Sequence, residues 1–312
     1  MQRVIDAIST FWSHIEDVRP APLAIAMGCQ VLKLACTSRA WRNVLAAAYP
    51  DERVRWRSIF GAYIAGVGVN AVFPVRTGDI VRLYLGRRAI PGSSYATLIS
   101  STLVLLIVDF LLALGLFAWA LTLGVLPSID ALPSLPSFDF NWLFAHRTVR
   151  QVLLVVVVLA AITVAVWLRE RTESLRDRVA QAFTVVRTPG RYFRTVVSWQ
   201  LADWGLRLTT IWFALDAFNI HQSVRNVLLV QVTSSLATLV PVSPGGIGTE
   251  QAFLLYTLAG QASRTALLAF SVGLKLMLTV VNVVVGFTAI LLILRTFRFR
   301  RATADGDAEP KG

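Results

Sequence analysis

The chain has 312 residues, of which 55% are hydrophobic and 15% are charged, and its mean hydropathy is +0.63. A soluble domain is far less apolar and a β-barrel would show short alternating segments, so the composition predicts a polytopic α-helical membrane protein. The formal net charge is +12, but the basic residues flank apolar runs, which reports membrane topology. Nucleic acid is therefore not an expected partner.

The first third of the chain contains one weak span and a broken apolar run. Residues 1–20 include acidic residues and lack an apolar core, which predicts a short interfacial helix and excludes a signal peptide. The segment 21–41 is a weak span because Gln30, Lys33 and Arg39 interrupt it. The apolar run 58–73 ends at FPVRTGD, and the short segment IVRLYLGRR follows.

Longer apolar segments follow in the rest of the chain. The spans expected there are at 94–125, 148–168, 195–218 and 265–294. A second broken run, 224–240, is followed by PVSPGGIGTEQ and a short helix at 249–260. The final part of the chain, 301–312, is polar and is expected to be a disordered tail.

The distribution of basic residues predicts the orientation. Lys and Arg concentrate in 39–57, 82–88, 169–194 and 295–301, which the positive-inside rule places in the cytoplasm. This orientation is consistent only if 58–90 and 224–260 each enter and leave the membrane on the same side, as re-entrant helical hairpins. We expect a multi-pass protein of a bacterial inner membrane with a cytoplasmic C-terminus.

The two hairpin tips resemble each other. FPVRTGDI (73–80) aligns with VPVSPGGI (240–247), and the hairpins open to opposite sides. This predicts an inverted repeat within one transmembrane domain, 1–300, in which a linking helix (148–168) joins repeat 1 (21–125) to repeat 2 (195–294). Broken segments at corresponding positions indicate the substrate site of a transporter, where backbone N–H groups and helix N-termini attract anions.

Charged residues at the tips are the first candidates for substrate contact. Arg76 and Arg82 flank Asp79, and an arginine fork suits phosphate recognition. Alternatively, Arg76 and Asp79 pair to hold the turn, and Arg82 lies at the headgroup level. Glu250 begins the helix after the second tip, either as a helix-terminal residue or as a charge coupled to an ion or a salt bridge.

Four further charges lie within the expected spans. Asp203 and Arg207 are four residues apart and can pair on one helix face as a structural pair. Asp109 and Lys275 lie at nearly equivalent points of the two repeats, where a salt bridge or an ion switch is an alternative to coincidence. The sequence contains no metal-binding or catalytic motif, so we expect neither a cofactor nor an enzyme.

Three segments resemble a known family: SRAWRNVL, NAVFPVRTGDIVRLYL and LVPVSPGGIGTEQAF. They resemble the flippase-like family that includes the transmembrane region of lysylphosphatidylglycerol synthases, over nearly the whole chain. The resemblance implies an integral membrane protein that moves lipids or lipid-linked precursors between leaflets. The positions of the shared motifs are Arg76, Gly78, Asp79, Arg82, Pro244, Gly245, Gly246, Gly248 and Glu250.

Two departures from the family pattern bear on function. Family members often carry a Glu-Arg pair before the aspartate of the span after the first hairpin, where this chain has Leu105 and Leu106. The cytosolic aminoacyl-transferase domain of the synthases is also absent from this sequence, so lipid synthesis is not expected.

Three functional hypotheses follow. The first is a transporter or flippase for an anionic lipid or a polyprenyl-phosphate-linked molecule. The second is an accessory protein that organises a synthase or glycosyltransferase complex without transport, and Leu105 and Leu106 favour it. The third is an ion-coupled small-solute transporter, because such proteins share the broken-helix architecture.

Overall fold

The computed structural model describes residues 17–73, 76–122, 180–239 and 249–306. These residues are mostly helical, and none of them forms a strand. Three helices are long and apolar enough to cross a membrane, namely α2 (Pro20–Ala48), the greater part of α5 (Tyr95–Thr122) and the N-terminal part of α13 (Arg264–Gly306). The chain is therefore an α-helical multi-pass membrane protein, as its composition predicts.

The other expected spans have different outcomes. The segment expected at 195–218 forms a helix, α10 (Ser198–Ala217), which carries Asp203 and Arg207 and is not among the three described helices that are long and apolar enough to cross a membrane. The linking helix 148–168 and most of the N-terminal helix lie outside the described residues. Helix α13 continues to Gly306, into the segment expected to be a disordered tail.

Proline and serine residues set the helix ends. Proline occupies the first turn of α2, and Pro50 and Pro74 stand just beyond the ends of α2 and α3 (Trp56–Val72). Serine hydroxyls cap three helices by accepting backbone N–H bonds: Ser94 from Thr97 at α5, Ser223 from Asn226 at α11 (Val224–Leu239), and Ser263 from Ala266 at α13.

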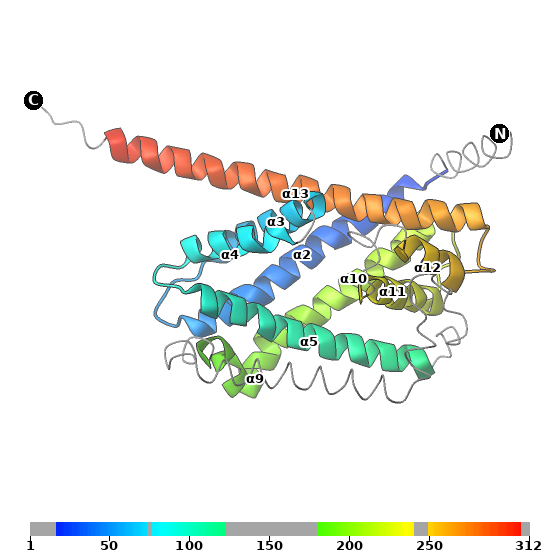
Figure 1. Cartoon of the computed structure of the whole chain (residues 1–312), viewed down its shortest axis with the longest axis horizontal. Helices are drawn as coiled ribbons and strands as arrows, with labels where there is room; N and C mark the ends of the chain where they lie inside the picture. Colours follow the sequence, from blue (N-terminus) through cyan, green and yellow to red (C-terminus); the bar gives the residue numbers. More distant parts are fainter. Residues whose placement is uncertain (1–16, 74–75, 123–179, 240–248, 307–312) are drawn as a thin grey trace, which may run out of the picture.

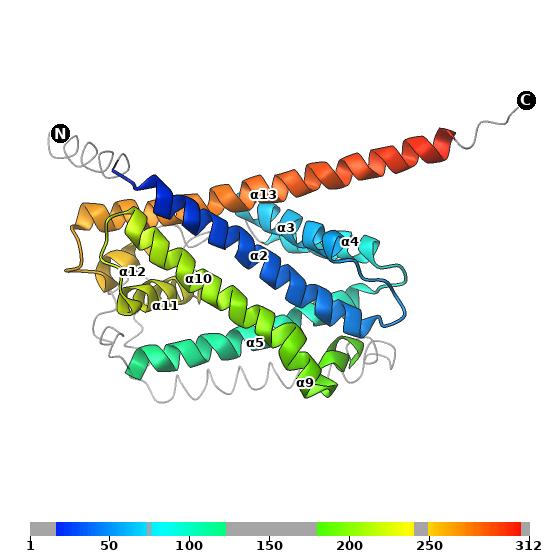
Figure 2. The same ribbon diagram turned by 180° about the vertical axis from the view of Figure 1, so that it is seen from behind.

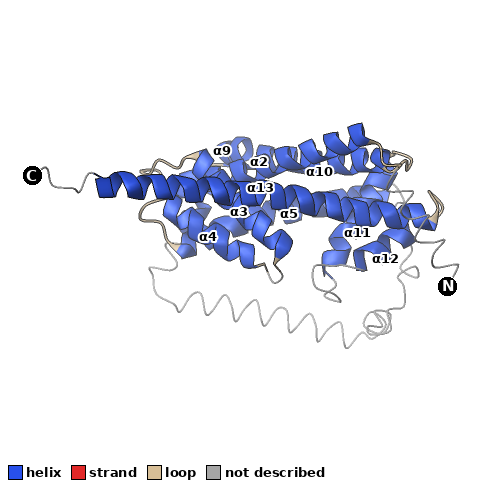
Figure 3. Ribbon diagram, turned by 90° about the horizontal axis from the view of Figure 1, so that it is seen from above, coloured by secondary structure: helices blue, strands red, loops and turns tan. Residues whose placement is uncertain are grey.

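Two helix pairs lie at opposite ends of the bundle (Figures 1 and 3). One consists of α3 and α4 (Thr77–Ala89), and the other of α11 and α12 (Thr249–Thr257). Helices α2 and α10 pack side by side through the middle, and α13 runs along the bundle and projects beyond it at its C-terminal end (Figures 1 and 2). The short segments η2 (Phe183–Arg187), α9 (Pro189–Tyr192) and η3 (Phe193–Val197) precede α10.

The helices contact one another in matched sets. Helix α13 contacts α2 and α3, while α5 contacts α10 and α11. Likewise α2 contacts α3 and α5, while α10 contacts α11 and α13. Suppose that α2, α3, α4 and α5 correspond, in that order, to α10, α11, α12 and α13. Each of these helix contacts in the first half of the chain then has a counterpart in the second half.

Helices α3 and α4 approach each other closely because glycines face glycines. A methyl group on Gly66 would lie 2.6 Å from the carbonyl oxygen of Gly78. The Asn70 side chain joins the pair, since its Oδ1 accepts from the Gly78 N–H (2.7 Å) and its Nδ2 donates to Asp79 Oδ1 (3.3 Å). Gly78, which the sequence places in a shared motif, therefore serves close helix packing.

Candidate functional site

Three charged side chains meet where α5 and α10 lie together. Arg207 Nη2 lies 3.2 Å from Asp203 Oδ2 and 3.8 Å from Asp109 Oδ1. The Asp203 side chain is almost fully buried, at 5% exposed, whereas that of Asp109 is 39% exposed. Trp204 also holds Asp109, because its indole Nε1 donates to the same Asp109 Oδ1 at 2.7 Å. The predicted i,i+4 pair of Asp203 and Arg207 is thus confirmed, and it is extended by Asp109.

Helix α2 completes this group. The Thr37 hydroxyl donates to Asp203 Oδ1, and Lys33, one turn earlier, lies within electrostatic range of Asp109, Asp203 and Arg207. Three of these charges lie near the middle of their helices: Lys33 in α2, Asp109 in α5, and Asp203 in the helical segment 189–217. We refer to Lys33, Asp109, Asp203 and Arg207 as the central charge cluster. It holds two cations and two anions, so it is formally neutral.

Arg82 lies beside this cluster, among aromatic side chains. Its guanidinium carbon is 5.1 Å from the Trp41 ring centre and 5.7 Å from that of Tyr63, and its Nη2 donates to Thr102 Oγ1 at 3.2 Å. Tyr63 is within electrostatic range of both Arg82 and Arg207. Trp41, Tyr63 and Thr102 thus hold the guanidinium between α2, α3 and α5.

Both arginines present an unused hydrogen-bond donor. Among the described residues, neither Arg82 Nε nor Arg207 Nε has a hydrogen-bond partner, although both atoms are buried. An unsatisfied buried N–H costs about 1–3 kcal/mol, and more for a charged group. The two donors are therefore suited to an acceptor that the described residues do not supply, such as a phosphate oxygen.

The first tip differs from one of the two sequence-based alternatives for Arg76. Arg76 is exposed and adopts the left-handed conformation (φ 54°, ψ 34°) as the residue before α4. A non-glycine residue rarely takes this conformation, which costs roughly 1–3 kcal/mol and concentrates at functional sites. Asp79 bonds to Asn70, and within the described residues no Arg76–Asp79 ion pair forms. The structural pair considered from the sequence is therefore absent.

Glu250, at the start of the helix after the second tip, forms a salt bridge, as one of its two sequence-based alternatives predicts, with a partner that the sequence did not indicate. Lys275 Nζ on α13 lies 3.2 Å from Glu250 Oε2 in the first turn of α12. The ion pair considered for Asp109 and Lys275 is therefore wrong, because Asp109 pairs with Arg207 and Lys275 with Glu250. The remaining motif positions of this tip, Pro244, Gly245, Gly246 and Gly248, lie outside the described residues.

Sequence reasoning missed several residues of the site. Lys33 was visible as a charge within an apolar segment, which is a usual signal of function in a membrane helix. Thr37, Trp41 and Tyr63 carried no such signal, since hydroxyl and aromatic side chains are common in membrane helices. Leu105, one of the two leucines that depart from the pattern implied by the family resemblance, is buried, and its carbonyl accepts from Gln200 Nε2 at 2.8 Å.

Comparison with known proteins gives one match. A family model described as the lysylphosphatidylglycerol synthase TM region matches residues 6–286. No curated protein and no solved structure matches the chain.

Proposed function

The chain belongs to the lysylphosphatidylglycerol synthase transmembrane-region family, and we propose that it moves an anionic lipid or a polyprenyl-phosphate-linked molecule between leaflets. The family and the spanning helices place it in a bilayer. The anionic nature of the cargo, the direction of movement and the location in a bacterial inner membrane with a cytoplasmic C-terminus are parts of the proposal.

The observation that carries the proposal is a pair of unused arginine donors, one within the central charge cluster and one on Arg82. Arg82 Nε and Arg207 Nε are buried without a partner among the described residues, and both arginines lie within electrostatic range of Tyr63. Ionised groups are costly inside a membrane and mark substrate or ion pathways. Because Lys33 and Arg207 balance Asp109 and Asp203, Arg82 adds one net positive charge, which complements an anionic headgroup.

The arrangement of the helices supports a transporter. The matched contacts of the two halves agree with an inverted repeat, in which α3–α4 and α11–α12 are the re-entrant hairpins. In such proteins the substrate site lies near the bilayer midplane, between the repeats. The central charge cluster, which lies between α2, α5 and α10, is the candidate for that site.

Leaflet exchange tests the proposal directly. The purified protein is reconstituted into liposomes that contain fluorescent phosphatidylglycerol, fluorescent phosphatidylcholine or a fluorescent polyprenyl-phosphate sugar, and dithionite measures the outward-facing fraction over time. We expect faster exchange of an anionic cargo than in protein-free liposomes, and little change for phosphatidylcholine. Absence of acceleration for every anionic lipid would overturn the proposal.

A matched pair of arginine variants separates site chemistry from surface charge. Arg82→Gln removes the cation with the unused Nε, whereas Arg191→Gln removes an exposed arginine before α10. Loss of one charge-assisted contact weakens binding by about 1.5–3 kcal/mol, so Arg82→Gln should slow exchange roughly tenfold or more at limiting lipid. Arg191→Gln should exchange at the wild-type rate. Equal effects of the two changes would contradict a specific role for Arg82.

One observation favours a second function, that of an accessory protein in a lipid or glycan synthesis complex. Leu106 stands where relatives often carry a charge and is 59% exposed, which gives an apolar surface suited to lipid or to a partner helix. Affinity purification from membranes followed by mass spectrometry tests this function. Stoichiometric retention of a synthase or glycosyltransferase, without leaflet exchange, would support it over transport.

A further inference from the structure

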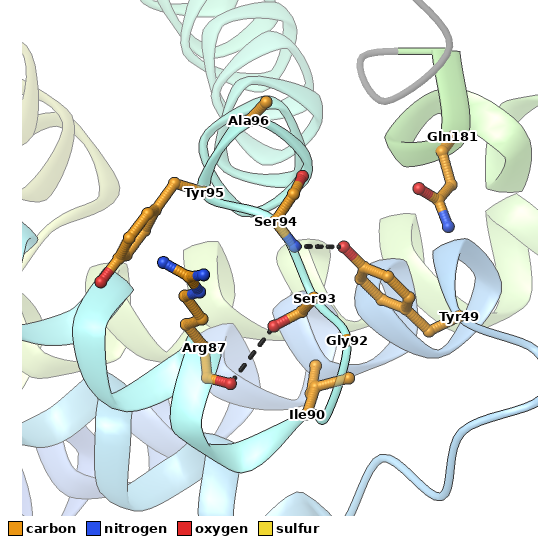
Figure 4. A pocket seen from close by; sticks show the side chains of 9 residues that line it. All are labelled: Tyr49, Arg87, Ile90, Gly92, Ser93, Ser94, Tyr95, Ala96 and Gln181. Carbon is orange, nitrogen blue, oxygen red and sulfur yellow. Dashed lines mark hydrogen bonds between the residues drawn. The ribbon is translucent and has the colours of Figure 1, made fainter. Parts of the chain in front are cut away.

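A polar pocket lies at the end of the molecule where α4 turns into α5 (Figure 4). Its volume is about 570 Å³, within the range of about 300–1,000 Å³ that is typical of small-ligand sites. Tyr49, Arg87 and the Ser93–Ser94 turn line it. The Ser94 N–H donates to the Tyr49 hydroxyl at 3.0 Å, and the Ser93 hydroxyl donates to the Arg87 carbonyl at 3.3 Å. These bonds fix the shape of the pocket wall.

An apolar groove of about 680 Å³ adjoins this pocket. Residues of α3, α4, α5 and α13 line the groove, including Ile80, Ile99 and Ile290. Tyr95 lines both the pocket and the groove, so the two cavities meet at its ring. A polar cavity that continues into an apolar one matches an amphiphile, with a headgroup on one side and a hydrocarbon chain on the other.

One arginine–tyrosine stack lies where the two cavities meet, and a second lines the apolar groove. The Arg87 guanidinium lies 4.5 Å from the Tyr95 ring centre, and that of Arg88 lies 4.9 Å from the Tyr84 ring centre. Figure 4 shows the Arg87 guanidinium between the Tyr95 ring and the Ser93–Ser94 turn. No carboxylate of the described chain lies within ion-pair distance of Arg87. A stacked guanidinium keeps its planar fork available for a phosphate.

We propose that the pocket and the groove form one binding site for an anionic glycerophospholipid, with the phosphate at Arg87 and an acyl chain along Ile80, Ile99 and Ile290. The positive-inside rule places this end at the cytoplasmic leaflet. The site lies apart from the central charge cluster and holds a lipid at the periphery of the bundle. The choice of an anionic lipid as the ligand rests on the proposed function. The test of the site, however, measures lipid binding and does not depend on transport.

Photolabelling tests the site. The full chain is placed in phosphatidylcholine nanodiscs that contain phosphatidylglycerol with a photoreactive diazirine in an acyl chain, and labelled peptides are mapped by mass spectrometry. We expect labels in α4, in the first turns of α5 and in α13. Unlabelled phosphatidylglycerol should compete more strongly than phosphatidylcholine, and free glycerol 3-phosphate should not compete. Competition by glycerol 3-phosphate would overturn the assignment to a lipid.

Variants separate the two parts of the site. Arg87 and Ile99 are both exposed, so changes there remove no core contact. Arg87→Ala should lower phosphatidylglycerol labelling about tenfold, and Arg87→Lys should retain part of it. Ile99→Trp fills the groove and should lower labelling by diazirine forms of phosphatidylglycerol and phosphatidylcholine alike. Arg191→Ala, a control arginine outside both cavities, should label as wild type.

The outcomes distinguish this site from the transport proposal. Labelling that is unchanged by Arg87→Ala, or that falls equally with Arg191→Ala, would overturn the site even where leaflet exchange is rapid. Mapped labelling that depends on Arg87 would support the site even if no anionic lipid exchanges between leaflets. In that case only the proposed transport would fail.

Discussion

Removal of Arg207 should destabilise the protein, because this residue is the only cation of the described chain within ion-pair distance of both Asp109 and Asp203. At an effective dielectric constant of about 20, unit charges separated by the 3.2 Å between Arg207 and Asp203 attract each other by about 5 kcal/mol. The Asp109 contact contributes less, since it is longer and the Asp109 side chain is 39% exposed. Leaving the buried Asp203 without its partner typically costs about 3–5 kcal/mol.

Thermal unfolding in a mild detergent measures this cost. Arg207→Ala should lower the unfolding midpoint by roughly 10 °C. The double variant Arg207→Ala with Asp203→Asn should recover most of that loss, because the amide introduced by Asp203→Asn is neutral and keeps an oxygen to accept from the Thr37 hydroxyl. Asp216→Asn serves as a control on the same helix, since Asp216 pairs with Arg19 away from the cluster.

Leaflet exchange by the stabilised double variant then separates two roles. If the central charge cluster binds cargo, the double variant should be folded but inactive. If the cluster only holds helices together, the double variant should be folded and active. An unfolding midpoint of Arg207→Ala within about 1 °C of wild type would refute the reasoning about the buried carboxylate, as would failure of the double variant to recover.

Three further predictions concern other parts of the molecule. Arg76→Ala should change the free energy of unfolding by less than about 0.5 kcal/mol, because Arg76 is exposed and has no ion-pair partner among the described residues, yet it should slow leaflet exchange if Arg76 contacts cargo. Gly68→Val should lower the yield of folded protein in size-exclusion chromatography, since a Cβ there would lie 2.7 Å from the Gly286 Cα on α13. A membrane-impermeant thiol reagent applied to intact cells should label a cysteine introduced at His221 and not one at Glu52; the reverse pattern would invert the proposed orientation.

Membrane class and most helix positions could be predicted from the sequence. Hydropathy alone located α2, α5 and α13, because about 20 consecutive apolar residues have few alternatives to a spanning helix. The break at FPVRTGD marked the end of α3, since proline cannot continue a helix. The Asp203–Arg207 pair was predictable for the same local reason: residues four apart share a helix face.

Contacts between distant helices depended on the tertiary structure. Asp109 and Lys275 stand at similar positions of the two halves, yet each pairs with a different residue. The rotation of a long apolar helix about its own axis decides which residue its single charge meets, and an almost uniformly apolar surface leaves that rotation unspecified. Packing between α2, α5 and α10 sets it here, and thereby brings Lys33, Thr37 and Asp109 to the pair on α10.

The sequence by itself determined the type and approximate position of the elements and the local ion pair, because these depend on residues within one or two turns of each other, whereas α2 and α13 extend beyond the spans expected for them. The tertiary structure alone decided that Arg82 lies between aromatic rings and that Asn70 joins α3 to α4. It also decided that a polar pocket and an apolar groove meet at Tyr95. Each of these features requires side chains from separate helices at a fixed distance. Close packing between helices sets that distance, and a one-dimensional pattern of apolar residues does not encode the packing.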